Sequence, residues 1–235
     1  MRAEILFPEV CNLYGDLQNV YYLQRCCPSL EIVETDLKSK PRFLEEDVTL
    51  VFMGSTTEQG LKLAADALRP YREAIAEKVD AGQLFLATGN ALDILGDAID
   101  SDAAERIDGL GLLPTRAEYH MMRRHNSFFV GKFEDMDIVG FKSLFGHSHG
   151  MGDALFDTVK GVGRDGTPQS GEGFRRGGLM ATYLIGPLLI LNPPLCKWLL
   201  RQMGADDTLA FEEAAMDSYR KRLSEFMEPG RSWKY

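Results

Sequence analysis

The sequence predicts an α/β fold of three layers, in which helices flank a central, mostly parallel sheet, with added β structure in the second half. Two observations support this fold class. Short apolar runs alternate with amphipathic segments over roughly the first 100 residues, which is the pattern of βαβ units. Beyond about residue 105, closely spaced glycines separate short β-like runs, so this half is predicted to be a meander of strands and loops.

Each apolar run of the first half is a predicted strand, and the segments between them are predicted helices. The strands are Glu4–Phe7, Glu31–Thr35, Val48–Met53 and Leu84–Ala87, and the helices are Asp16–Cys26, Gln59–Ala81 and Ala91–Ile99. The run VTLVF is too uniform for a sheet with one wet face, and it fits a central strand buried on both sides. Apolar residues from Leu61 to Ile75 recur every three or four positions, which indicates one face of a helix.

The C-terminal part is predicted to contain a charged last helix, Thr208–Met227. No linker rich in Pro, Ser or Gly divides the chain and no repeat is visible, so we predict one domain over residues 1–235. The segment Gly177–Cys196 carries no charge, but prolines at 187, 193 and 194 interrupt it. It is therefore predicted to be a buried strand, a loop and a helix rather than a membrane span.

Charge and cysteine content exclude several classes of partner and compartment. The 35 acidic and 26 basic residues give a net charge of -9, which disfavours nucleic acid and anionic membrane as main partners. The four cysteines, Cys11, Cys26, Cys27 and Cys196, form no C-x-x-C pair, and we expect reduced thiols. The first ten residues contain charges and a proline, unlike a signal peptide, so a cytoplasmic protein is expected.

The loop after Val48–Met53 is one candidate binding site, because ligands of open parallel sheets bind beyond the carboxyl ends of the strands. Gly54 allows close approach to the backbone. The N–H groups and hydroxyls of Ser55 and Thr56 suit an oxyanion or a carboxylate. The alternative is an ordinary helix cap formed by Ser55 or Thr56.

The turn after Leu84–Ala87 is the second candidate. Thr88, Gly89 and Asn90 lie between a predicted strand and a predicted helix, which is the topology of a nucleophile elbow. No Ser or Cys stands there, and Thr88 is its only hydroxyl. The alternative is a tight turn with Asn90 as a helix cap.

Six motifs along the chain follow the order in which one protein family carries them. They are NLYGD with Asn19, the Gly54 loop ending in Glu58-Gln59, the turn at residues 88–96, GLGLLP (109–114), GFKSLFGHS (140–148) and ATYLIGPLLILNPPL (181–195). In these motifs the chain resembles the class I glutamine amidotransferases of the cobyric-acid-synthase type, over essentially its whole length. Within that family it is most similar to the GatD-type subunits of lipid II isoglutaminyl synthases.

The resemblance implies a site that has lost its catalytic residues. The family hydrolyses glutamine with a Cys thiolate, a His that activates it and an oxyanion hole. The family's nucleophile block reads Cys-Gly-Gly-Tyr-Gln-Leu-Leu-Gly. When its last three residues are aligned with Ile94-Leu95-Gly96, the family's Cys falls on Gly89 and its Gln on Asp93. Shifting the alignment by one residue would place the Cys on Thr88 instead. The block Gly-Thr-Tyr-Leu-His-Gly-Pro-Leu-Leu places the His on Ile185. We therefore expect no glutamine hydrolysis by the family mechanism, with Thr88 a poorly activated substitute.

Other polar clusters complete the candidate site. The resemblance implies that Arg123, Arg124 and Asn126 contact a substrate or a partner, whereas their alternative role is a solvated strand edge. His147 and His149 have no acid or thiol at ligand spacing within their loop, so no metal site is expected. No phosphate-loop motif occurs, so no cofactor is expected in this chain.

Three functions remain open at this point. The first is a partner or regulatory subunit with a degenerate glutaminase site and a possible small-molecule ligand in its pocket. Its partner would be a Mur-ligase-like, ATP-dependent amide ligase that amidates cell-wall precursors, as the resemblance implies. The second is an enzyme with a repurposed pocket at the Gly54 and Gly89 turns. The third is an accessory protein of cobalamin (cobyric acid) biosynthesis.

Overall fold

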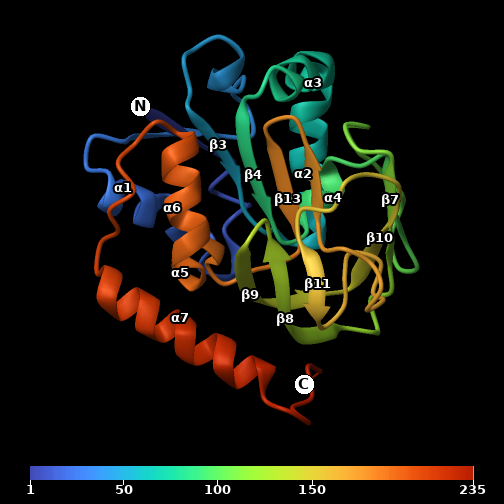
Figure 1. Cartoon of the computed structure of the whole chain (residues 1–235). Coiled ribbons are helices and arrows are strands. Elements are labelled where there is room, and N and C mark those ends of the chain that lie inside the picture. The colour runs from blue at the N-terminus through green and yellow to red at the C-terminus, as the bar shows by residue number, and fades with distance from the viewer. Residues whose placement is uncertain (235) are drawn as a thin grey trace.

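The computed structural model describes residues 1–234, and its centre is a six-stranded sheet with the strand order β12-β13-β4-β3-β1-β2 (Figure 1). Five strands are parallel and the edge strand β12 is antiparallel to β13. The strands are β1 (Arg2–Leu6), β2 (Glu31–Thr35), β3 (Leu50–Met53), β4 (Leu84–Thr88), β12 (Phe174–Arg176) and β13 (Leu179–Thr182). This confirms the predicted α/β class with a mostly parallel central sheet.

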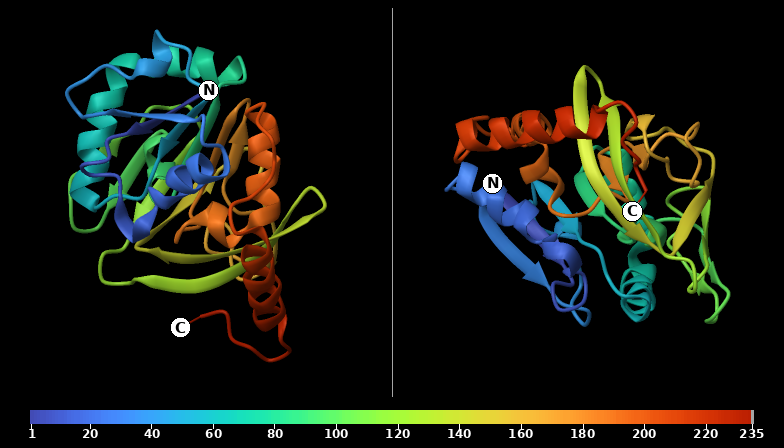
Figure 2. Two further views of the ribbon diagram at one scale, coloured as in Figure 1. Left: turned by 90° about the vertical axis from the view of Figure 1, so that its left-hand side faces the viewer. Right: turned by 90° about the horizontal axis from the view of Figure 1, so that it is seen from below.

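Helices cover both faces of this sheet, and alternate residues of each strand supply the two cores (Figure 2). Val51 packs with Leu61 of α2 (Glu58–Leu68) and Ile75 of α3 (Arg72–Asp80). Phe52 faces the other way, toward the core formed with α1 (Gln18–Cys26), α5 (Leu188–Leu191) and α6 (Pro193–Gln202). The uniform apolar character of β3 therefore reflects burial on both sides.

The second half adds two smaller sheets, one mixed because β5 and β7 run parallel and one fully antiparallel, in agreement with the strands and loops that the glycine pattern predicts. One sheet has the order β10-β7-β5-β6 and the other has the order β11-β8-β9. Their strands are β5 (Ala98–Ser101), β6 (Ile107–Asp108), β7 (Thr115–Tyr119), β8 (His125–Phe133), β9 (Met136–Leu144), β10 (Gly146–Gly150) and β11 (Asp157–Lys160). The last helix, α7 (Glu212–Met227), lies across β8 and β9, where the Phe226 ring stacks on Phe128 at 4.3 Å between centroids.

All four predicted helices are longer in the prediction than in the structure, the first by only two residues because α1 begins at Gln18. The segment Gln59–Ala81 is split by a 3-10 turn, η3 (Arg69–Tyr71), because Pro70 has no N–H to continue the first helix. The helix predicted over Ala91–Ile99 is only one turn, α4 (Ala91–Ile94), and its last residues belong to β5. The last helix starts at Glu212 rather than Thr208.

The uncharged segment Gly177–Cys196 folds as predicted, into β13, a loop, α5 and the start of α6. Asn192 lies between the two helices and is fully buried. Its side chain accepts the Val139 N–H at 2.7 Å and donates to the carbonyls of Val139 and Leu188 at 2.7 and 2.9 Å. No helix within residues 1–234 has the length and apolar character that crossing a membrane requires.

Candidate functional site

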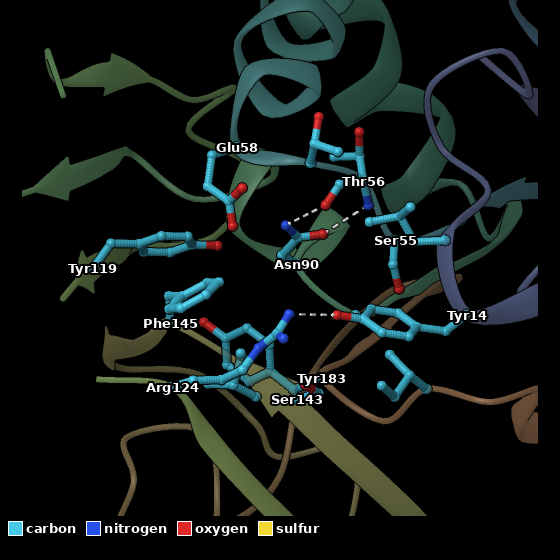
Figure 3. Close-up of a pocket in the computed structure, with 15 residues that line it drawn as sticks. Tyr14, Ser55, Thr56, Glu58, Asn90, Tyr119, Arg124, Ser143, Phe145 and Tyr183 are labelled. Atoms are coloured by element: carbon cyan, nitrogen blue, oxygen red, sulfur yellow. Dashed lines mark hydrogen bonds between the residues drawn. The ribbon is translucent and has the colours of Figure 1, made fainter. Parts of the chain in front are cut away.

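The candidate site is a cavity of about 170 Å³ at the carboxyl ends of β3, β4 and β13, three neighbouring strands of the central sheet (Figure 3). The loops that leave these strands meet there, as the rule for open parallel sheets predicts. The cavity is lined by Leu13, Tyr14, Ser55, Thr56, Thr57, Glu58, Gly89, Asn90, Tyr119, Arg124, Ser143, Leu144, Phe145, Tyr183 and Ile185. The structure therefore brings the Gly54 loop, the Gly89 turn and Ile185 into one site.

The buried carboxylate of Asp16 connects the segments that form the floor of this cavity through hydrogen bonds. It follows the 3-10 turn η1 (Leu13–Gly15), and it accepts hydrogen bonds from the N–H and Oγ of Ser55 at 2.9 and 2.5 Å. The hydroxyl of Thr88 donates to the same oxygen at 2.9 Å, and the N–H of Gly186 lies 3.5 Å from the other oxygen. Burial raises the pKa of Asp16 above its usual value, more than these donors lower it.

Gly89 is the turn that joins β4 to α4, and its geometry is that of an elbow. Its φ of +61° is a conformation that side chains rarely adopt. A Cβ built on Gly89 would lie 2.0 Å from Ser55 Oγ and 3.1 Å from Ile185 Cγ2. Position 89 and position 185 are therefore neighbours, and the Ser55 side chain occupies the space that a side chain at position 89 would need.

Two predicted helix caps are corrected by the structure. Asn90 makes no side-chain capping bond to α4; instead its amide accepts the Thr56 N–H at 2.9 Å and donates to the Thr56 carbonyl at 2.8 Å. The cap of α2 is Thr57, whose hydroxyl accepts the Gly60 N–H at 3.1 Å, and not Ser55 or Thr56. Ser55 and Thr56 are thus left to shape the cavity and its floor (Figure 3).

Asp93 is a second buried carboxylate, just behind the cavity wall. It accepts hydrogen bonds from the hydroxyls of Tyr119 at 2.6 Å, Tyr183 at 2.5 Å and Ser148 at 2.8 Å. Burial raises the pKa of Asp93 to about 6, although the three hydroxyl donors oppose that shift. Because Tyr119 and Tyr183 line the cavity, Asp93 fixes the orientation of two wall residues. The hydroxyl of Thr88 donates to Asp16 and not to Asp93.

Opposite charges face the cavity from two sides. Glu58 is in the first turn of α2, and Arg124 precedes β8 (Figure 3). The Arg124 guanidinium donates to the hydroxyl of Tyr14 at 3.2 Å and lies 4.8 Å from the centroid of the Phe145 ring. Within residues 1–234, neither Glu58 nor Arg124 is paired with an oppositely charged side chain.

The remaining predicted residues lie at the margin of the cavity. Arg123 lines a neighbouring surface hollow that it shares with Arg124 and His147. Asn126 lies behind the wall, where its side-chain oxygen accepts the hydroxyl of Ser143 at 2.8 Å. No group of three His, Cys, Asp or Glu side chains in the described part of the chain is arranged to hold a metal ion.

Sequence reasoning missed Asp16, Glu58 and Tyr14 as parts of the site. Asp16 and Tyr14 belong to the NLYGD motif and Glu58 to the motif of the Gly54 loop, and both motifs carry the family resemblance only as a whole. Tyr14 and Asp16 lie in and just after the 3-10 turn η1, and Glu58 is the first residue of α2. None of the described residues that line the cavity is a cysteine or a histidine.

Sequence comparison finds curated relatives of similar length. The chain is 25% identical over 211 residues to the lipid II isoglutaminyl synthase (glutamine-hydrolyzing) subunit GatD of Staphylococcus aureus, covering 88% of this chain and 86% of the relative. It is 26% identical over 236 residues to the protein of the same description from Streptococcus pneumoniae, covering 94% of this chain and 89% of the relative.

Structural comparison finds the same architecture in solved proteins. A glutamine amidotransferase crystal structure aligns with a TM-score of 0.58 at 13% identity, covering 86% of this chain and 99% of the other. A second, from Thermotoga maritima, aligns with a TM-score of 0.50 at 10% identity, covering 97% of this chain and 86% of the other. These matches concern the fold. The model of the CobB/CobQ-like glutamine amidotransferase domain matches residues 3–191, and the chain belongs to this family.

Proposed function

We propose that this chain is a glutamine amidotransferase-like subunit with a degenerate glutaminase site, and that it partners a Mur-ligase-like, ATP-dependent amide ligase acting on cell-wall precursors. The family match and the two GatD relatives support an amidotransferase-type subunit. Both relatives are described as parts of a lipid II isoglutaminyl synthase, which favours cell-wall amidation over the corrinoid alternative.

The observation that carries the proposal is the placement of Gly89 against Ile185. These are the two positions where the family's Cys and His are expected, and a Cβ at 89 would lie 3.1 Å from the Ile185 side chain. A thiol and an imidazole at these positions would therefore be neighbours. Glycine has no nucleophile and isoleucine cannot move a proton, so neither half of the catalytic pair exists.

Ser55 supports the same conclusion independently. Its hydroxyl stands 2.0 Å from the place of a Cβ at 89, where no side chain at 89 could be accommodated without movement. The hydroxyl is held there by Asp16, and the Ser55 N–H is bonded to the same carboxylate. The site is thus packed around a glycine, with the Ser55 side chain in the space above it.

The cavity retains the features of a binding site for a small zwitterion. Glu58 and Arg124 present opposite, unpaired charges in the described structure, and hydroxyls and an amide lie between them (Figure 3). An α-amino acid carries the matching ammonium and carboxylate. We therefore include in the proposal that the subunit binds free glutamine without hydrolysing it.

Restoring the missing groups is the sharpest test. In the triple variant Ser55→Gly, Gly89→Cys and Ile185→His, a diazoketone analogue of glutamine should label position 89. The variant Gly89→Cys with Ile185→His, which keeps Ser55, should label more slowly because Ser55 Oγ obstructs the new side chain. A control with Ser55→Gly and Ile185→His has no thiol and should not react. A folded triple variant that takes no label would refute the placement of the two family positions.

The function of the unmodified protein is tested with its partner. Co-expressed with a Mur-ligase-like subunit from the same genome, the chain should form a complex that amidates its acceptor with free ammonia and ATP. Glutamine should not replace ammonia. Calorimetry with glutamine should detect binding to the wild type, weakened by Arg124→Gln and by Glu58→Gln. Ammonia release from glutamine by the wild-type chain would contradict the proposal.

A repurposed serine enzyme is the second candidate, and Ser55 is the observation that favours it. Its hydroxyl lies in the cavity and donates to the buried Asp16 at 2.5 Å, as a nucleophile donates to its base. A fluorophosphonate probe decides between the candidates. Labelling of the wild type that is lost in Ser55→Ala would favour the enzyme, whereas no labelling favours the binding subunit.

A further inference from the structure

A second recess, of about 300 Å³, lies beside the cavity, and most of the side chains that line it carry nitrogen donors. We call it the histidine hollow, and its polar lining consists of Glu118, His120, Arg123, Arg124, His125 and His147. Arg124 and Phe145 line both recesses and form their shared wall (Figure 3). Three of the four histidines of the chain therefore gather in one place outside the candidate site.

Main-chain pairing positions the walls of this hollow. The His120 N–H donates to the Phe145 carbonyl at 2.8 Å, and the Arg123 N–H donates to the His120 carbonyl at 2.8 Å. These bonds hold the connection between β7 and β8 against the turn between β9 and β10. His147 of β10 lies opposite Glu118 of β7 in the antiparallel register, so their side chains share one face of that sheet. The hollow is thus built by the backbone and is present without a ligand.

Positive charge exceeds negative charge in the hollow. Within residues 1–234, no carboxylate pairs with Arg123 or Arg124. Arg124 donates to the Tyr14 hydroxyl at 3.2 Å, which leaves other N–H groups of its guanidinium for a ligand. Among the described residues that line the hollow, Glu118 is the one acid. Two guanidinium groups without a counter-ion favour an anion as occupant.

The imidazoles supply polar groups of a second kind. The rings of His125 and His147 meet edge to face, with 5.2 Å between their centroids. The Nδ1 atom of His147 is buried and has no hydrogen-bond partner within the described residues, whereas His125 Nε2 lies 2.9 Å from Ser127 Oγ. Buried polar atoms in proteins almost always have a partner. An orphaned nitrogen in a residue that lines a recess therefore indicates a polar occupant.

The two rings are neutral at pH 7, and an anion would change that. Burial, followed by the neighbouring cations, lowers the pKa of His147 to about 4 and also lowers the pKa of His125. Besides the rings themselves, the charged and titratable groups that act on them are Lys142, Lys234, His149 and Asp165. An anion beside an imidazole favours its protonated form. Occupancy of the hollow should therefore be visible in the ring signals of these histidines.

We propose that the histidine hollow binds a phosphoryl group, with Arg123, Arg124 and the imidazoles of His125 and His147 as its donors. A phosphate has more acceptor oxygens than a carboxylate and carries up to two negative charges, so it matches a larger set of donors. Free phosphate and a phosphate ester present the same group to the hollow, and the experiment below separates them. The proposal does not depend on the function proposed for the cavity.

The wild-type protein contains its own control, because His149 is the one histidine outside the hollow. In carbon–proton NMR spectra of the full-length chain at pH 7, inorganic phosphate should shift the ring signals of His125 and His147 saturably, and those of His149 much less. Acetate at the same ionic strength should bind more weakly. Tighter binding of phenyl phosphate would identify an ester as the source, and binding of inorganic phosphate alone would identify the free ion. Equal shifts of all four histidines, no saturation, or tighter binding of acetate would each overturn the proposal.

Calorimetry with inorganic phosphate tests the arginine of the hollow that does not line the cavity. Arg123→Gln should weaken phosphate binding by about tenfold, the loss expected for a charge-assisted hydrogen bond. Arg72→Gln removes the same charge from α3, outside the hollow, and should leave the affinity unchanged. Glu118→Gln should tighten binding, because it removes the acid that repels an anion. Equal weakening by Arg123→Gln and Arg72→Gln would show general electrostatic attraction and refute the site. Glutamine binding to the cavity, measured in Arg123→Gln, should not change, which separates this test from that of the proposed function.

Discussion

Ser55 occupies the space above Gly89, so the effects of substitutions at these two positions on the free energy of unfolding should be strongly coupled. In Gly89→Ala, the added methyl would meet Ser55 Oγ at 2.0 Å and Ser55 Cβ at 2.8 Å, in a backbone with φ of +61°. Two separate penalties therefore act, one from the backbone conformation and one from the clash. Only the clash is removed when Ser55 is replaced by glycine.

The magnitudes follow from these two penalties. An L residue in the left-handed region costs about 1–2 kcal/mol, and overpacking a filled site costs about 1–3 kcal/mol. Gly89→Ala alone should thus lower the free energy of unfolding by about 2–5 kcal/mol. Ser55→Gly alone should cost about 1.5–3 kcal/mol, because the Asp16 carboxylate loses a hydroxyl donor. In the Ser55→Gly background, Gly89→Ala should cost only about 1–2 kcal/mol.

Urea denaturation of the four proteins of this cycle measures the coupling directly. We expect Gly89→Ala to be less destabilising by about 1–3 kcal/mol when Ser55 is absent. If Gly89→Ala costs the same in both backgrounds, Ser55 does not occupy the space above position 89. The argument for a repacked site would then fail, whatever the activity of the protein.

Three further predictions concern buried polar groups. Lys142 and Glu172 form an ion pair and are both fully buried. Lys142→Met should destabilise the fold by about 3–5 kcal/mol because it leaves the Glu172 carboxylate buried without its partner, and adding Glu172→Gln should recover part of this loss. If the two changes in the free energy of unfolding were additive, the ion pair would be contradicted. Asp93→Asn should remove a pH dependence of the free energy of unfolding. Because the pKa of Asp93 is raised to about 6, its contribution to the stability of the wild type is complete below about pH 4 and is lost as pH rises through about 6. In thermal unfolding, the Tm of the wild type should fall more between pH 4.5 and pH 7 than the Tm of the variant. Asn192→Ala should cost about 2–4 kcal/mol in chemical denaturation, since it removes the side-chain partners of the Val139 N–H and carbonyl; the Leu188 carbonyl keeps the backbone N–H of residue 192. A cost below about 0.5 kcal/mol would disprove this role.

The central strands β3 and β4 were predictable because burial on both faces produces uniform apolar runs, whereas β2 is a partly exposed edge strand. The predicted strand Glu31–Thr35 matches β2, and the runs around Met53 and Leu84 fall on β3 and β4. The helix boundaries were less accurate. An apolar period of three to four continues past Pro70, so periodicity alone did not reveal the break that the missing N–H causes.

The position of the site in the fold could be predicted from the sequence, but the contacts among its residues could not. The turns after β3 and β4 were identified from their glycines, and the resemblance supplied Gly89 and Ile185. The relation among Asp16, Ser55 and Thr88 depends on β1, β3, β4 and β13 lying side by side, which is a property of strand order. No local pattern encodes that order. The Asp93 network likewise draws partners from β7, β10 and the loop after β13.

The carboxylate of Asp16 has a consequence for how any occupant enters the cavity. Because one side chain joins the loop after β3, the end of β4 and the loop after β13, these segments cannot rearrange independently of one another. The conformational entropy that mobile loops would lose on binding a ligand has therefore already been lost when the protein folds. Entry should consequently be a rigid, lock-and-key event at the base of the recess, with adjustment confined to its mouth, where the Tyr14–Arg124 contact must open and re-form.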